Sequence, residues 1–306
     1  MSMPKVSGAR VHSGNLIPVI WAQKFMVFFY LATALAAISN TDYEGLIKNH
    51  GDEVDINVLP VVTSHEYIDG QDLVYDDPKS ETVKLMIDKA RYFAFSASYI
   101  DKAQASIEYI EKWAEHFSQT LKRDIEYDVF KSVFANAHTF NTGATAGADS
   151  GDIDLGTVSA PLVLTKLNII DAIVDWGDVL DQQSVPDLDR TICLPTWACA
   201  MIKKSELKDA SITGDDQSPV RNGRIGKIDR FEIFSTRNLS TGMDSGSKVW
   251  NSFANHKSAI TFASQLTASE RLPAQKTFGT LIRTMQSFGF EAVKTEALMH
   301  LYLAKG

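Results

Sequence analysis

The feature that most restricts the fold is a long stretch, residues 101–137, that contains neither Gly nor Pro. Asp101 and Gln104 form a capping-box pattern at its start. Apolar residues then recur every three or four positions, at Ile107, Ile110, Trp113, Phe117, Leu121, Ile125, Val129 and Val133. The pattern predicts one amphipathic helix of about 35 residues, roughly 50 Å long. Its many aromatic residues argue against the narrow apolar seam of a coiled coil.

The segment before this helix predicts an extended β-hairpin. Val54, Ile56 and Val58 alternate with polar residues, as in a half-buried strand. Alternation resumes at residues 82–87, and residues 91–100 predict a partly buried strand. The intervening residues 60–82 are rich in turn formers and poor in large apolar side chains. We therefore expect two strands joined by a long, exposed excursion, of the kind that is usually functional or disordered.

Beyond the long helix, helical and extended patterns alternate. Helical patterns occur at 157–167, 169–180 and, after Pro273, at 272–287. Residues 189–202 predict a strand, a Pro turn and a helix. In 219–239 a tight Asn222-Gly223 turn leads into a strand that includes Glu232–Phe234. A closing strand is predicted at 291–303.

The N-terminal region allows two interpretations. Residues 1–17 predict an extended arm, and Pro18 suits the first turn of a helix over 18–38. Residues 25–38 are almost wholly apolar and follow three basic residues, which is also typical of a secretory signal that would end near residue 36. The apolar run is shorter than the about 20 residues that a membrane span needs. From the pattern alone, a buried helix and a signal peptide both remain possible.

Composition excludes some classes of protein. The hydrophobic content of 44% and charged content of 22% are ordinary for a globular chain. Residues 1–41 contain no Asp or Glu, so the net charge of −8 is concentrated on the rest of the chain, which disfavours a nonspecific nucleic-acid binder. Cys193 and Cys199 match no zinc pattern and no disulfide framework, and their apolar context predicts core positions.

No motif points to catalysis. The loop 141–156 has evenly spaced glycines but lacks the Gly-Lys-Ser/Thr of a phosphate-binding loop. Its three aspartates lack the Glu that would complete a calcium loop. The seven histidines form no compact ligand set, and no Gly-x-Ser-x-Gly elbow occurs. The sequence therefore predicts a protein that is not an enzyme, with no catalytic residue, no metal and no cofactor.

Three segments carry a family resemblance. They are AAISNTDYEGLIKNHGDEVDI (36–56), PVRNGRIGKIDRFEIFSTRNL (219–239) and FGFEAVKTEALMHLYLAKG (288–306). Together, and collinearly over nearly the whole chain, they resemble the major capsid proteins of tailed bacteriophages, which share the Hong Kong 97-type fold. Related proteins carry an apolar N-terminal helix at the same place, which favours the buried helix over the signal peptide.

The resemblance implies an α+β fold with four parts. Residues 1–48 would form the N-terminal arm with its apolar helix, and 49–100 the E-loop hairpin, which in the family reaches over a neighbouring subunit. Residues 101–140 and 228–285 would form the peripheral domain, with 101–137 as its spine helix. The axial domain would comprise 141–227 and 286–306.

The resemblance also implies a structural role. The chain would assemble into pentamers and hexamers of an icosahedral shell around double-stranded DNA, which it would enclose without sequence-specific contact. Expected partners are a separate scaffolding protein, a portal protein and possibly a decoration protein, with no membrane. The location would be the virion capsid, after assembly in the host cytoplasm. Alternatives are an encapsulin-like or gene-transfer-agent shell of the same fold, or a secreted protein with residues 1–36 as signal peptide.

We expect the contacts between subunits to involve residues of the arm and of the hairpin with its flanking strands. The candidate assembly residues are Trp21, Phe25, Phe28, Phe29, Tyr43, Glu44, Tyr67, Tyr75 and Arg91.

Overall fold

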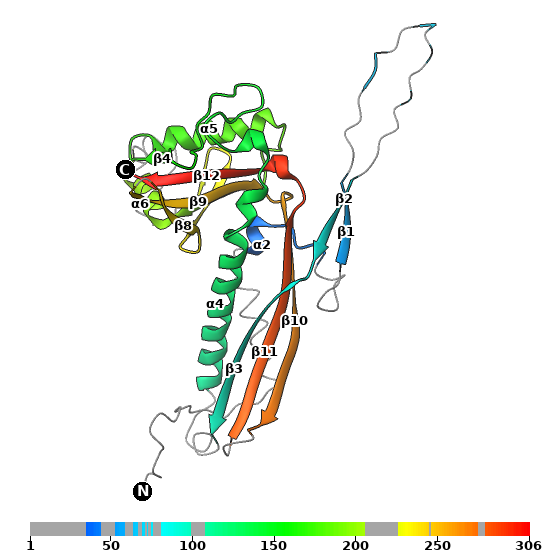
Figure 1. The fold of residues 1–306 in the computed structure, drawn as a ribbon, viewed down its shortest axis with the longest axis vertical. Helices are drawn as coiled ribbons and strands as arrows, with labels where there is room; N and C mark the ends of the chain where they lie inside the picture. Colours follow the sequence, from blue (N-terminus) through cyan, green and yellow to red (C-terminus); the bar gives the residue numbers. More distant parts are fainter. Residues whose placement is uncertain are drawn as a thin grey trace.

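The computed structural model is elongated, with three parts that Figure 1 separates clearly. It describes residues 35–43, 53–58, 64–66, 69–70, 72, 75, 81–98, 108–205, 226–244, 246–274 and 279–306. Within these residues the strands form a two-stranded, a three-stranded and a seven-stranded sheet. We call them the hairpin, the stem and the head.

The stem consists of a three-stranded sheet and one long helix. Strands β10 (Ile260–Pro273), β11 (Gly279–Ala292) and β3 (Lys89–Ser98) pair in that order, all antiparallel, and α4 (Glu108–Phe130) runs along them. Phe93 of β3 stacks on Phe117 of α4 with their ring centroids 4.8 Å apart. Leu121, Ile125 and Val129 follow on the same helix face and are buried, as their spacing predicts.

The head is built on a seven-stranded sheet. Its order is β4 (Leu162–Leu164), β12 (Leu298–Lys305), β9 (Ser247–His256), β5 (Arg190–Pro195), β7 (Phe231–Thr236) and β6 (Lys227–Ile228), with β8 (Ser240–Asp244) pairing with β9. Helices α5 (Ile169–Gln182) and α6 (Thr196–Lys204) belong to the same core. Every residue of the central strand β5 is buried. Phe130 meets Phe253 edge-on at 5.1 Å, so one continuous core joins head and stem.

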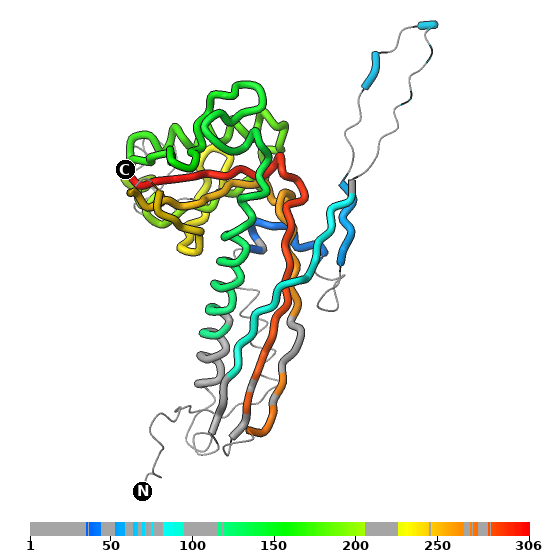
Figure 2. Tube along the Cα trace, viewed as in Figure 1, coloured from blue at the N-terminus to red at the C-terminus, as the bar shows by residue number. Residues whose placement is uncertain are grey.

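The hairpin pairs β1 (Glu53–Val58) with β2 (Glu81–Met86), antiparallel and in register from Glu53 opposite Met86 to Val58 opposite Glu81. The predicted strands and their pairing are therefore confirmed. Figure 2 shows that the chain runs from β2 directly into β3, so hairpin and stem are continuous.

Two predicted helices are wrong. Residues 272–287, expected as an amphipathic helix, lie mainly in strand β11: Thr284 and Gln286 are buried toward α4, whereas Arg283 points away. The apolar residues that suggested a period of 3.6 are divided between the two faces of the strand: Phe288 is buried in the core on the α4 side, whereas Leu281 is partly exposed on the other face. Residues 157–167, expected as helical, contain the short strand β4 instead.

Three boundaries also differ from prediction. Helix α4 ends at Phe130, and short 3-10 turns at Val133–Asn136, Thr139–Asn141 and Thr295–Ala297 interrupt the chain. The closing strand begins at Leu298, because residues up to Ala292 belong to β11. Residues 228–256 were expected in the peripheral domain together with the long helix, but they pair with β5 and β12 in the head. Residues 286–292 were expected in the axial domain, but they extend strand β11 of the stem. Long-range pairing, which no local pattern encodes, decides these positions.

Other predictions agree with the structure. Helix α5 and the strand–turn–helix of β5 and α6 lie where expected. Cys193 and Cys199 are buried in the core, and burial raises the pKa of both thiols. Only residues 35–38 of the predicted N-terminal helix are described, as α2 (Leu35–Ile38). Among the described residues no helix is long and apolar enough to cross a membrane.

Candidate functional site

The base of the hairpin is seated on the stem by a small apolar cluster. Ile56 of β1, Leu85 of β2, Ile87 and Ala263 of β10 are all buried in it. Gly289 of β11 lies directly beneath: a Cβ there would come 2.9 Å from Ile87 Cδ1 and far inside contact distance of the Met86 carbonyl. The glycine is therefore needed for the backbones of hairpin and stem to approach so closely. We call the contact region formed by Ile56, Leu85, Ile87, Ala263 and Gly289 the seat of the hairpin.

A short segment before β1, residues 35–43, ties this seat to the rest of the molecule; we call it the strap. The Asn40 amide donates to the Ile260 carbonyl at 2.8 Å, and the Phe262 amide donates to the Asn40 carbonyl at 2.9 Å. The Asn255 side chain donates to the Ile38 carbonyl at 2.7 Å from the head. These hydrogen bonds fix the end of the N-terminal region at the junction of head, stem and hairpin.

Strands β1 and β2 of the hairpin point away from the head and the stem (Figure 1). All residues described between its two strands whose exposure is given are solvent-exposed, and Tyr75 is 86% exposed. The segment 66–81 contains six acidic residues and one lysine: Glu66, Asp69, Asp72, Asp76, Asp77, Glu81 and Lys79. An acidic projection of this kind has little apolar surface to bury within its own subunit.

The candidate assembly residues are dispersed. Tyr43 is half-buried and packs against the cluster at the hairpin base. Tyr75 lies on the exposed part of the hairpin. Arg91 makes a bidentate ion pair with Asp128 of α4 at 2.8 and 2.7 Å, and this hydrogen bonding raises its pKa. The remaining candidates, Trp21, Phe25, Phe28, Phe29, Glu44 and Tyr67, lie outside the described residues.

The structure reveals an open stem face that sequence reasoning missed. Because the two sides of a strand alternate, the residues opposite to the α4-facing set share the other face of the sheet. Tyr92 is 74% exposed there, Leu272 and Leu281 are partly exposed, and Arg283 pairs with Glu270 across β10 and β11. A groove of about 500 Å³ lies over Tyr92, Met285 and this ion pair. The period-two pattern of Leu281, Arg283 and Met285 could have signalled it, but the helical interpretation of 272–287 concealed it.

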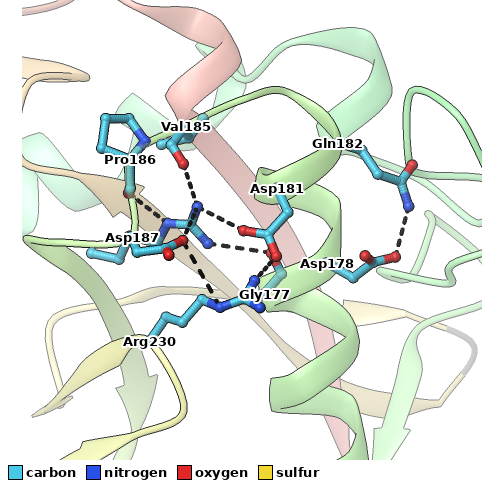
Figure 3. A network of polar contacts seen from close by, with 9 residues as sticks. Gly177, Asp178, Asp181, Gln182, Val185, Pro186, Asp187 and Arg230 are labelled. Atoms are coloured by element: carbon cyan, nitrogen blue, oxygen red, sulfur yellow. Dashed lines mark hydrogen bonds and ion pairs between the residues drawn. The ribbon is translucent and has the colours of Figure 1, made fainter.

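A second missed feature is a buried arginine in the head (Figure 3). The Arg190 side chain is 0% exposed and donates to the carbonyls of Val185, Pro186 and Gly177. It also pairs with Asp181 at 2.8 Å and with Asp187 at 3.3 Å, two carboxylates that Arg230 contacts from outside.

Burial lowers the pKa of Arg190, but the guanidinium keeps its charge because arginine starts from so high a value. This network fixes residues 183–189 between α5 and β5. The network has a structural role, because the N–H groups of Arg190 donate to backbone carbonyls of its own chain.

The described residues hold no group of three or more His, Cys, Asp or Glu side chains that could bind a metal ion. The exposed features among the described residues are the part of the hairpin between its two strands and the open stem face.

Comparison with known proteins agrees with this geometry. A family model described as phage capsid protein matches residues 80–301. Comparison with curated protein sequences gives no match. Among solved structures, that of Mycobacterium phage Che8 has a TM-score of 0.64 at 21% identity, over 88% of this chain and 90% of that one.

Two further structures are similar. The mature capsid of bacteriophage PhiM1 has a TM-score of 0.63 at 12% identity and covers 99% of this chain and 92% of its own. The capsid of the native GTA particle has a TM-score of 0.56 at 14% identity, with coverage of 99% and 96%. The fold expected from the sequence resemblance, the Hong Kong 97-type capsid fold, is thereby confirmed.

Proposed function

This chain belongs to the phage capsid protein family, and from that premise we propose that it is the major subunit of an icosahedral phage head. Proteins of this family are structural, and the chain is a shell protein. The finer proposal is that it forms pentamers and hexamers that enclose double-stranded DNA without reading its sequence. We further propose that the hairpin is the E-loop, α4 the spine helix, the stem the core of the peripheral domain and the head the axial domain.

The observation that supports this proposal is the arrangement of the hairpin: its base packs against the stem, and its two strands project from it. Its base is fixed by the Ile56–Leu85–Ile87–Ala263 cluster and by Gly289, whereas the residues described between its two strands are exposed. A rigidly placed projection that its own subunit does not cover is suited to bind a second copy. Because projection and body are different surfaces, each copy can bind the next in the same sense. Such head-to-tail contacts form a closed ring when the rotation from one copy to the next divides a full turn.

The assembly residues follow from the same argument. Tyr43 would act by holding the hairpin base, Tyr75 by direct contact with a neighbour, and Arg91 by fixing β3 to α4. Trp21, Phe25, Phe28, Phe29, Glu44 and Tyr67 remain proposals from the sequence. Many modest contacts of this kind, repeated around a closed shell, make a very stable object.

The proposed partners are other copies of the chain, a separately encoded scaffolding protein and a portal protein, with a decoration protein as an optional further component. Assembly would take place in the host cytoplasm and the mature protein would reside in the virion capsid. We propose no enzymatic activity for the chain itself.

A second candidate function keeps the fold and changes the cargo. The similarity to the native GTA particle capsid, and to a virus-like particle from Pyrococcus furiosus with a TM-score of 0.53, supports a gene-transfer-agent or encapsulin-like shell as the alternative. All these proteins share the architecture, so the enclosed cargo distinguishes them.

The test is to express the full chain, purify its assemblies and image them by electron microscopy. We expect closed icosahedral particles or rings of five and six subunits, and an intact mass for residues 2–306. A compact monomer at every concentration would contradict the shell function. Loss of about 36 N-terminal residues would instead support the secreted alternative. Sequencing of enclosed DNA from native particles would separate a phage head, with one genome, from a gene-transfer agent with random host fragments.

A further inference from the structure

A polar groove lies between helix α4 and the end of strand β7. It has a volume of about 640 Å³. Every residue that lines it is polar or charged: Gln119, Lys122, Arg123 and Glu126 of α4, and Ser235, Thr236, Arg237 and Asn238 at the end of β7 and just after it. The four helix residues recur with helical spacing and share one face of α4. That face differs from the one that Leu121, Ile125 and Val129 bury in the core.

The accessible charge of the groove is positive. Arg123 and Arg237 are exposed, and Lys122 is half-buried. Arg123 approaches Asp124 at 3.7 Å, but both side chains are exposed, and ion pairs of that kind contribute little. Arg237 has no ion-pair partner among the residues that the structure describes. The two arginines therefore offer their charge to a ligand.

The groove is also ordered by hydrogen bonds. Glu126, the one carboxylate of its lining, is buried and accepts a hydrogen bond from the Asn238 side chain at 2.9 Å. Lys122 lies 4.0 Å from the same carboxylate and partly neutralises it. The Asn238 backbone amide donates to the Thr236 hydroxyl at 3.1 Å. These contacts fix the residues on both sides of Arg237, so less conformational entropy is lost when its side chain binds a ligand.

We propose that this groove binds phosphate groups of the double-stranded DNA that the shell encloses. The inference rests on the proposed shell function and names a surface of the subunit that touches the cargo. The lining has the side chains that contact DNA phosphates: arginine and lysine supply the charge, and Ser, Thr, Asn and Gln supply neutral hydrogen-bond donors. Contacts of this kind do not read the base sequence, as enclosure of a whole genome requires.

A protein segment is a poorer occupant of this groove. The centre of a protein–protein interface is enriched in aromatic and apolar residues, and the lining contains neither. The groove on the open stem face is the contrast, because Tyr92 and Met285 line it and its Arg283 is already paired with Glu270. The groove at α4 offers positive charge without an apolar anchor, which suits a phosphate backbone.

The groove and the seat of the hairpin lie on different sides of the stem. The seat is on the sheet face that carries Ala263 and Gly289, whereas α4 packs on the face that carries Phe93 and Thr284 (Figure 1). One subunit can therefore bind DNA at the groove while its hairpin is engaged elsewhere. Because the chain has a net charge of −8, a single groove binds DNA weakly, and the many grooves of one shell bind it together.

Neutral substitutions test the proposal on the full chain. Purified, unassembled subunits are titrated against a fluorescent DNA duplex long enough to contact several of them, and fluorescence anisotropy is measured at increasing salt concentration. R123Q/R237Q should weaken binding at low salt at least about fivefold. It should also reduce the slope of log affinity against log salt concentration by about 2, because two phosphate contacts are lost. R123K/R237K should retain most of the affinity, since lysine supplies the same charge.

The matched control is K166Q/K257Q, which makes the same change in net charge at exposed lysines outside the groove. It should bind the duplex like the original chain. Circular dichroism verifies that each variant is folded, and electron microscopy should show that each forms the same particles as the original chain. Polyglutamate, added as a competitor, should displace the duplex much less effectively than unlabelled DNA, because its linear charge density is lower.

Four results would overturn the proposal. The first two are absence of duplex binding by the unaltered chain and equal binding by R123Q/R237Q and K166Q/K257Q. Equal displacement by polyglutamate and by DNA would assign the groove to an acidic protein segment. Loss of particles in R123Q/R237Q alone would assign it to a contact between subunits. Failure of the shell function is distinguishable, because the unaltered chain would then form no particles, whatever its affinity for the duplex.

Discussion

The head and the hairpin bury their apolar surface in different ways. In the head, strand β5 is covered on both faces and even the charged Arg190 is enclosed and fully hydrogen-bonded by its own chain. In the hairpin, only the seat is buried, and the described part of its extension is exposed. The head therefore contains the interactions that stabilise it, whereas we propose that the hairpin binds a surface outside its subunit. Stability and assembly should accordingly respond to different mutations.

The largest effect is expected from removing the hairpin extension. Replacing residues 63–81 by a short Gly-Ser turn should leave the circular dichroism spectrum and thermal midpoint near normal, because the described residues of this segment are exposed. Assembly, measured by light scattering, should fail or stop at small oligomers. Normal shells from the shortened chain would show that the hairpin is not the clamp between subunits. Unfolding would show that the segment belongs to the core, and the comparison of head and hairpin would then fail.

Arg190→Met tests the self-sufficiency of the head. The change leaves two buried carbonyls and one partly buried carbonyl without their donor and two aspartates without their buried partner, so the free energy of unfolding should fall by about 3 kcal/mol. Urea unfolding of the unassembled subunit measures it. Arg230→Met is the matched control, because Arg230 contacts the same two carboxylates from a partly exposed position, and it should cost under about 1 kcal/mol. Equal losses for the two variants would contradict a buried clamp at Arg190.

Gly289→Ala tests the seat that joins the two regions. The added methyl group collides with the backbone at Met86, so the hairpin should shift on the stem, at a cost of about 1–3 kcal/mol. Assembly should decline more than stability. Gly242→Ala in β8 is the control, because its Cβ would make ordinary contact at 3.6 Å from Val249. If Gly289→Ala assembled as well as Gly242→Ala, the orientation of the hairpin would not depend on this close approach.

The last prediction concerns the effect of acid on the head. His300 stacks on Phe134 and is hydrogen-bonded to Asn251 at 3.0 Å, and burial lowers its pKa from 6.5 to about 4. The folded head thus favours the neutral ring, and this stabilisation is complete above pH 6.5 and is lost as the pH falls toward 4. The loss amounts to at most about 3 kcal/mol. Thermal unfolding at pH 7 and pH 4.5 should show a smaller acid effect in His300→Gln than in the original chain; equal effects would contradict the assignment.

Much of the architecture was predictable from local patterns. The hairpin strands, the long helix, α5, and the strand–turn–helix of β5 and α6 each carry their periodicity within one continuous segment. The candidate site was only partly predictable: the exposed hairpin and Tyr75 followed from the lack of apolar residues, but the seat did not. Gly289, Ala263 and Ile87 come together only when β10, β11 and β2 pack.

What the sequence determined by itself were the elements whose signal is local: the 3.6-residue apolar repeat of α4, the alternation of β1, and the acidic, turn-rich excursion between β1 and β2. Tertiary structure alone decided which strands pair and which side chains become buried. Residues 272–287 show the reason most clearly. Their apolar spacing fits a helix, but β10 and β3 provide hydrogen-bonding partners on both sides of β11, and α4 covers one face. The free energy of that long-range pairing and burial exceeds the small differences in local propensity, and no window of sequence contains it.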